Sequence, residues 1–116
     1  MTAPDARRAL GVRGEDAIAA WYEARGYEVL ARNWRCRDGE LDLIVREGRL
    51  YVFCEVKTRT TDAFGTPAEA VNREKQMRLR RLAARWLMDA PTRPREIRFD
   101  VASVLAGDIE VLEGAF

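Results

Sequence analysis

Apolar residues recur along this chain with two different periods, which predict its helices and strands. Ile18 and Tyr22 lie on one helical stripe, which predicts a helix over residues 14–25 that ends at Gly26. Residues 1–12 before this helix are expected to be flexible. Apolar residues at alternating positions predict five strands, over residues 27–34, 40–46, 50–58, 95–105 and 109–112.

A second helix is predicted between the third and fourth strands. Residues 66–69 form a capping box with Pro67 at the first helical position, and the helix is expected to continue to about Asp89. Its core stripe consists of Val71, Leu79, Leu82 and Trp86. The order α-β-β-β-α-β-β predicts an α/β fold of the α+β kind, in which helices flank a mixed sheet in one domain over residues 1–116.

The hairpin between the second and third strands decides which charged side chains share a face. With Glu47 and Gly48 as the loop, Asp42 pairs with Phe53 and is the diagonal neighbour of Glu55, at about 7 Å between Cα atoms. Because side chains alternate between faces, a one-residue slip would separate the two acids. On the predicted register one face carries Glu40, Asp42, Glu55 and Lys57.

Glu15 falls on the inward stripe of the first helix, three residues before Ile18 and seven before Tyr22. Two interpretations are open at this point. Glu15 either faces the other acids from the helix, or it is a first-turn acid that interacts favourably with the helix dipole.

Composition restricts the chemistry that this chain can perform. The sequence contains no histidine, which excludes catalysis by His pairs and His-containing metal sites. Of its 20 basic residues only Lys57 and Lys75 are lysines, and the rest are arginines. Lys is a compact charge whose pKa shifts readily on burial, so its use at position 57 favours a specific role for an ammonium group there.

The cysteine pattern and the hydropathy indicate an ordinary intracellular protein. Cys36 and Cys54 do not form a CxxC pair, so neither a disulfide framework nor a zinc site is expected, and Cys54 is predicted to be a core residue. No apolar run is long enough to span a membrane, and the first residues lack the apolar segment of a signal peptide. We therefore expect a cytoplasmic protein without membrane contact.

Acids on neighbouring strands, followed by a lysine, are typical of metal-dependent phosphodiester hydrolysis. Asp42 and Glu55 are the expected ligands of Mg²⁺ or Mn²⁺, with the Val56 carbonyl as a third. Lys57 would orient or deprotonate the attacking water, or neutralise charge on the phosphate. Glu15 would complete the metal site or hold a metal-bound water, and Glu40 is an accessory acid. The alternative is a surface cluster of ion pairs without catalytic function.

Basic residues near these acids are candidates for contacts with the phosphates of a nucleic acid. They come from the connection before the second strand, from the end of the third strand and from the second helix. A run of charges on a helix can also be a solvated face. The candidate nucleic-acid-binding residues are Arg35, Arg59, Arg73, Lys75, Gln76, Arg78, Arg80 and Arg81.

These motifs together resemble the YraN family of small bacterial proteins, and the resemblance covers nearly the whole chain. The residues that carry it are Gly11-x-x-Gly14-Glu15, Gly26-Tyr27, Arg32-Asn33-Trp34-Arg35, Gly39-Glu40-Leu41-Asp42-Leu43-Ile44, Phe53-x-Glu55-Val56-Lys57-Thr58-Arg59 and Lys75-Gln76-x-Arg78-Leu79. That family in turn resembles the restriction-endonuclease-like PD-(D/E)xK superfamily, particularly the archaeal Holliday junction resolvases. The resemblance implies that fold and a metal site formed by Glu15, Asp42, Glu55 and Lys57. Leu41 stands where the superfamily often has a proline that is not a ligand.

The leading hypothesis is a Mg²⁺- or Mn²⁺-dependent DNA endonuclease that acts on branched or damaged DNA. Resolution of a junction needs two active sites, for which a twofold homodimer is the expected assembly. Two other functions are consistent with the same residues. One is a nucleic-acid-binding module of the same fold that does not cut, and the other is an adaptor that binds proteins.

Overall fold

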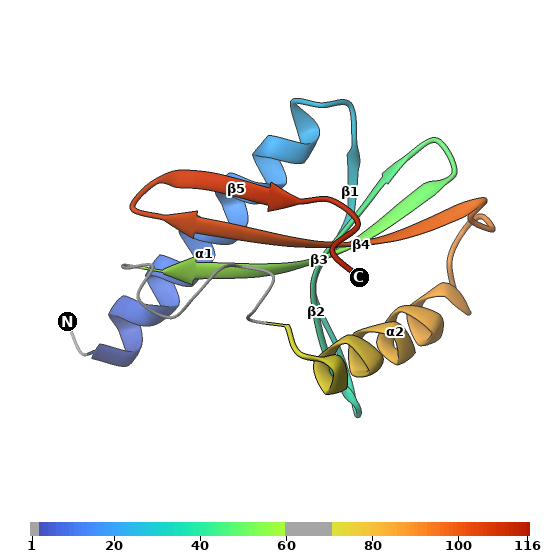
Figure 1. Cartoon of the computed structure of the whole chain (residues 1–116), viewed down its shortest axis with the longest axis horizontal. Helices are drawn as coiled ribbons and strands as arrows, with labels where there is room; N and C mark the ends of the chain where they lie inside the picture. Colours follow the sequence, from blue (N-terminus) through green and yellow to red (C-terminus); the bar gives the residue numbers. More distant parts are fainter. Residues whose placement is uncertain (1–2, 60–70) are drawn as a thin grey trace.

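The chain forms a five-stranded sheet with two helices. The computed structural model describes residues 3–59 and 71–116, with side chains from residue 10 onward. Its elements are α1 (Ala3–Glu23), β1 (Glu28–Cys36), β2 (Gly39–Glu47), β3 (Leu50–Arg59), α2 (Arg73–Leu87), β4 (Glu96–Leu105) and β5 (Asp108–Leu112). The strands lie in the order β1-β2-β3-β4-β5, and only β3 and β4 are parallel (Figure 1). The predicted element order and the mixed sheet are confirmed.

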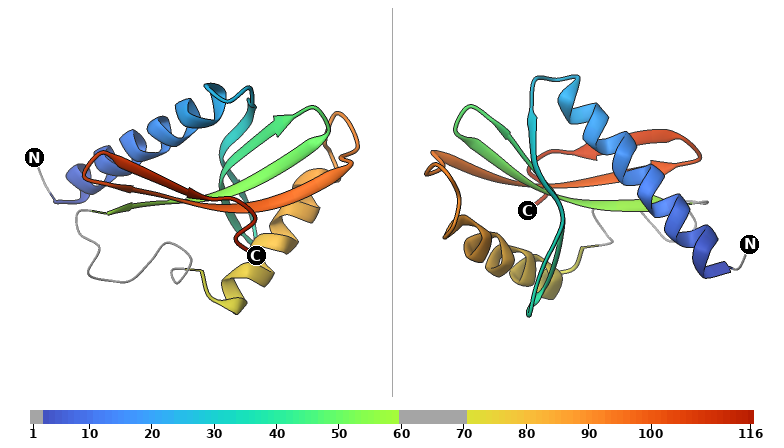
Figure 2. Two further views of the ribbon diagram at one scale, coloured as in Figure 1. Left: turned by 45° about the horizontal axis from the view of Figure 1, so that its top comes forward. Right: turned by 180° about the vertical axis from the view of Figure 1, so that it is seen from behind.

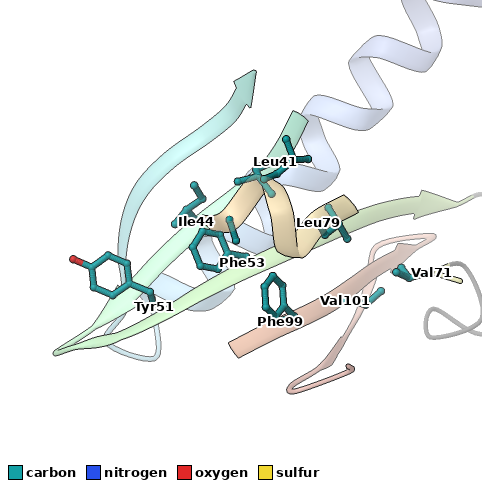
Figure 3. Close-up of a cluster of buried hydrophobic side chains, with 10 residues drawn as sticks. Leu41, Ile44, Tyr51, Phe53, Val71, Leu79, Phe99 and Val101 are labelled. Carbon is teal, nitrogen blue, oxygen red and sulfur yellow. The ribbon is translucent and has the colours of Figure 1, made fainter. Parts of the chain in front are cut away.

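The two helices cover opposite faces of the sheet (Figure 2). Alternate strand residues face them, so Val45 and Val52 pack with Tyr22 of α1, whereas Ile44 and Phe53 pack on the α2 side. Figure 3 shows the α2-side cluster, which includes Leu41, Ile44, Tyr51, Phe53, Val71, Leu79, Phe99 and Val101. Cys54 is buried in the α1-side cluster, as predicted. Among the described residues no helix is both long and apolar enough to cross a membrane.

The register of the β2–β3 hairpin differs from the predicted one by two residues. Arg46 pairs with Tyr51 rather than with Arg49, and the loop is Gly48-Arg49. Gly48 has φ = +60°, which is typical of two-residue hairpin loops with glycine at the first position. Because a shift by two preserves the faces, the register error did not separate the two acids. One residue beyond the last paired residues, Asp42 now lies opposite Glu55 instead of diagonal to it.

Strands β2 and β3 separate next to Asp42. Their pairing ends at Leu43 and Cys54, after which β2 pairs only with β1 and β3 pairs only with β4. Figure 1 shows the β1–β2 arm turning toward α2 while β3 continues alongside β4. At the tip of the arm, an added Cβ at Gly39 would lie 3.2 Å from the Leu82 side chain of α2. We call this opening between β2 and β3, lined by Asp42 and Val56, the strand fork.

Both helix starts differ from the predicted ones. Helix α1 begins at Ala3 rather than at Gly14, and its secondary structure therefore includes most of the segment expected to be flexible. Glycine is rare inside helices, but Gly14 lies where an added Cβ would come within 2.0 Å of the Thr58 hydroxyl oxygen on β3. The close packing of α1 on the sheet therefore explains why glycine occupies position 14, which the sequence pattern predicts as the start of the helix.

Helix α2 begins at Arg73, six residues after the predicted start at Pro67. Asn72 is the N-cap, and its side-chain oxygen accepts a hydrogen bond from the Lys75 backbone N–H at 2.9 Å. The predicted capping box at residues 66–69 lies outside the described residues. Val71, which was expected on the helical stripe, is buried just before the helix.

Candidate active site

Asp42 closes the inner end of the strand fork. Its Oδ2 atom accepts a hydrogen bond from the Val56 backbone N–H at 2.9 Å. Burial raises the pKa of Asp42 to about 7, and the negative charges of Glu55, Glu15 and Glu40 add to this effect against the hydrogen bond from Val56. Asp42 is therefore an acid whose negative charge is unfavourable in its surroundings. A cation at this position would relieve the repulsion.

Glu55 forms salt bridges with both lysines of the sequence. Its side chain is 10% exposed, and its Oε1 atom lies 3.4 Å from Lys57 Nζ and 3.1 Å from Lys75 Nζ. Lys57 comes from the same strand, whereas Lys75 comes from the first turn of α2. Burial lowers the pKa of Lys57, and the neighbouring Lys75 lowers it further, against the attraction of Glu55. The surroundings of Lys57 therefore ease the loss of a proton from its ammonium group, compared with an isolated lysine.

Glu15 lies on the α1 side of the fork. Its Oε2 atom accepts a hydrogen bond from Asn33 Nδ2 at 3.1 Å. Together with Asp42, Val56 and Thr58 it lines an open cavity of about 340 Å³. Since α1 begins at Ala3, Glu15 is more than three turns from the helix start, which excludes the first-turn interpretation. The interpretation in which Glu15 faces the other acids is the one the structure supports.

The accessory acid Glu40 lies toward the tip of the β1–β2 arm. It pairs with Arg35 on β1, with 3.4 Å between Arg35 Nε and Glu40 Oε2. Of the three acids that raise the pKa of Asp42, Glu40 makes the smallest contribution. The Arg35 side chain is 77% exposed, so this ion pair adds little to stability.

The donor atoms at the fork fit a hydrated Mg²⁺ or Mn²⁺. Within residues 3–59 and 71–116, no three acidic or cysteine side chains form a group that could hold a metal ion. Asp42 and Glu55 would supply two oxygen ligands, and the Val56 carbonyl faces the same opening as its N–H because both groups of a strand residue point toward one edge. Mg²⁺ is commonly bound by one or two carboxylates and keeps several waters. Glu15 lines the same cavity as Asp42 and Val56.

Three of the predicted nucleic-acid-binding residues lie together at the start of α2. Lys75, Arg78 and Arg81 line an open cavity of about 270 Å³ at the start of α2, together with Asn72 and Glu74. We call this the α2 basic cavity. Two other candidates, Arg80 and Gln76, make contacts within the fold. The guanidinium carbon of Arg80 lies 4.8 Å from the centre of the Phe99 ring and 5.5 Å from that of Phe116.

Gln76 also makes a structural contact, because its Nε2 donates to the Val71 carbonyl at 3.1 Å and holds the segment that precedes α2. Arg73 is exposed on the first turn of α2, and Arg59 is half-buried at the end of β3. Neither residue lines the α2 basic cavity.

Comparison with known proteins places the chain in a family. The sequence model of the uncharacterised protein family UPF0102 matches residues 14–104. The chain belongs to this family. A UPF0102 protein from Beutenbergia cavernae is 54% identical over 114 residues, which cover 94% of this chain and 97% of the relative. UPF0102 proteins from Frankia alni and Mycolicibacterium vanbaalenii are 51% and 49% identical, over 96% and 97% of this chain and 97% and 93% of their own lengths.

The resemblance to the YraN family is thereby confirmed as UPF0102 membership. The matched segment of this UPF0102 chain contains all the acids and both lysines of the site. Two residues have roles that the sequence analysis missed. Lys75 was assigned to nucleic-acid contacts, yet it shares Glu55 with Lys57, and the rarity of lysine was a signal for both positions. Asn33, which holds Glu15, has φ = +51°, a conformation that asparagine tolerates better than most residues.

Proposed function

We propose that this UPF0102 protein is a metal-dependent endonuclease that hydrolyses DNA phosphodiester bonds. The observation that supports it most strongly is the convergence of two carboxylates and both lysines at the strand fork. Asp42 carries a charge that a cation would stabilise, and Glu55 is nearly buried with two ammonium groups on one oxygen. A cluster of ion pairs with only a structural role does not explain why Asp42, whose negative charge is unfavourable there, lies beside it.

Each residue of the site has a different role in the proposed reaction. Asp42, Glu55 and the Val56 carbonyl would hold a Mg²⁺ or Mn²⁺ ion, which would supply Lewis-acid activation of the phosphate. Lys57, once it has lost its own proton to solvent, accepts a proton from the attacking water as the water oxygen bonds to phosphorus. The bond from phosphorus to one ester oxygen then breaks, and that oxygen takes a proton from solvent. Glu15 orients water on the α1 side of the fork.

The α2 basic cavity extends this site toward the rest of a DNA strand. Its lysine and two arginines outnumber its single acid, Glu74, so the surface attracts phosphates. Branched DNA is the substrate class that the resemblance to junction resolvases implies, with a twofold homodimer supplying the second site. The experiment is to incubate the protein with junction, flap and linear DNA in Mg²⁺, Mn²⁺ or EDTA.

Wild-type protein should cut at least one of these substrates only when metal is present. Asp42→Asn and Lys57→Ala should each lower the cutting rate by about 100-fold or more, the usual cost of removing a group that acts in the transition state. The exposed Asp38→Asn, in the β1–β2 turn, is the matched control and should cut normally. Equal cutting by the wild type, Asp42→Asn and Lys57→Ala would indicate a contaminant and refute the proposal.

A second function, DNA binding without cleavage, is favoured by one observation. Glu55 already has Lys57 and Lys75 as positively charged partners, so this carboxylate needs no metal to balance its charge. This alternative predicts salt-dependent DNA binding that Mg²⁺ leaves unchanged, and no cutting of any substrate.

A further inference from the structure

Lys75 belongs to two sites at once. Its ammonium group lies 3.1 Å from Glu55 Oε1, which places it in the carboxylate cluster of the fork. The same residue lines the α2 basic cavity beside Arg78 and Arg81. Its side chain is 22% exposed, so it is accessible from the cavity while it contacts Glu55. Lys57 also contacts Glu55 but does not line that cavity.

The contact between Lys75 and Glu55 opposes metal binding. A divalent cation that approaches Glu55 meets two ammonium groups within 3.4 Å of the oxygen that it needs. The repulsion is strong because the Glu55 side chain is only 10% exposed and water screens it poorly. Metal binding to the protein alone should therefore be weak.

A DNA phosphate offers Lys75 a second anion. The lysine side chain is long and its ammonium group can reorient, whereas the backbone of Lys75 is fixed by its hydrogen bond to the Asn72 cap. A phosphate held by Arg78 and Arg81 would lie beside the same ammonium group. Movement of Lys75 toward that phosphate would leave Glu55 with one cation instead of two.

We propose that Lys75 couples the two ligands: it occupies Glu55 in the DNA-free protein and releases it to a divalent cation when a backbone phosphate enters the α2 basic cavity. The proposal rests on the proposed function, since it requires a metal at Asp42 and Glu55. By linkage, DNA then raises the metal affinity by the same factor by which metal raises the DNA affinity. The protein would therefore bind the metal more tightly on DNA than without it.

The test measures Mn²⁺ binding directly, by electron paramagnetic resonance of the free ion, with and without a short DNA duplex. Any nicking leaves the number of backbone phosphates unchanged, so cutting does not disturb the measurement. The variants are Lys75→Met, which keeps an unbranched side chain without the charge, and Lys75→Arg, which keeps the charge. Arg85→Met is the matched control, because it removes a positive charge from the last turn of the same helix, outside the cavity.

In the wild type, DNA should raise the Mn²⁺ affinity by about 5-fold or more, within the usual range of coupling between sites. Lys75→Met should bind Mn²⁺ more tightly than the wild type without DNA and should lose most of the enhancement. Lys75→Arg and Arg85→Met should retain the enhancement.

If Lys75→Met matches the wild type under both conditions, the coupling is refuted while the metal site stands. If the wild type and Asp42→Asn bind Mn²⁺ equally poorly with and without DNA, both the coupling and the proposed metal-dependent function are refuted.

Discussion

Replacement of Asp42 by asparagine should stabilise the metal-free protein, although it removes a residue of the proposed site. The amide oxygen of the new side chain can still accept the hydrogen bond from the Val56 N–H, and the amide carries no charge. In the wild type, burial and the charge of Glu55 raise the pKa of Asp42 from 3.8 to about 7. Between these values the folded chain retains a proton that the unfolded chain has lost. The free energy of unfolding therefore falls as pH rises through this window.

The magnitude follows from the same pKa values. Each pH unit inside the window lowers the free energy of unfolding of the wild type by about 1.4 kcal/mol. The interval from pH 5 to pH 7 therefore lowers it by at most roughly 3 kcal/mol. Because Asp42 is partly exposed and shares the site with Glu55, we expect about 1–2 kcal/mol. The stability advantage of Asp42→Asn over the wild type should then grow by that amount between pH 5 and pH 8.

The assay is urea denaturation in EDTA at pH 5 and pH 8, followed by tryptophan fluorescence. Asp38→Asn, in the exposed β1–β2 turn, controls for the loss of a carboxylate outside the fork. Saturating Mg²⁺ at pH 8 should stabilise the wild type but not Asp42→Asn. A variant that is less stable than the wild type at pH 8, or a difference that does not change with pH, would refute this reasoning.

Three further predictions concern packing and charge. Gly14→Ala should destabilise the fold by about 1–3 kcal/mol in the same assay, because the new methyl group collides with β3. The new methyl group of Gly11→Ala meets nothing within 4 Å, so this variant should be neutral or stabilising by about 0.5–1 kcal/mol. Equal effects of the two substitutions would contradict the packing role of Gly14. Asp100→Ala should cost about 3–5 kcal/mol, since this fully buried carboxylate accepts bonds from tyrosine, arginine and backbone donors; a loss below about 1 kcal/mol would show that the network is dispensable. In a DNA-binding titration at low salt, Arg78→Ala should weaken the DNA affinity several-fold and Arg80→Ala should not, because Arg78 lines the α2 basic cavity and Arg80 does not. The reverse result would indicate that DNA binds on the side of Phe99, where Arg80 lies.

Local periodicity was sufficient for the elements and for their faces. Strand alternation placed Asp42, Glu55 and Lys57 together even though the predicted hairpin register was wrong by two residues, because faces repeat with that period. Periodicity did not predict the residues at which the two helices begin. Gly14 looked like a boundary because glycine is unfavourable in an isolated helix, and the contact with Thr58 that justifies it is 44 positions away in sequence. A similar limit applies to α2, whose actual cap, Asn72, is a weaker sequence signal than the Thr-Pro pair before it.

The order of the secondary-structure elements along the chain, the family and the set of charged residues available for chemistry can all be read from the sequence. How those residues meet depends on the packing of the folded chain. The separation of β2 from β3 beside Asp42, the packing of α1 that brings in Glu15 and the position of α2 that adds Lys75 to Glu55 are contacts between distant segments. Hydrophobic periodicity reports which side of an element is buried, but not which other element buries it. The surroundings that raise the pKa of Asp42 therefore arise only in the folded chain.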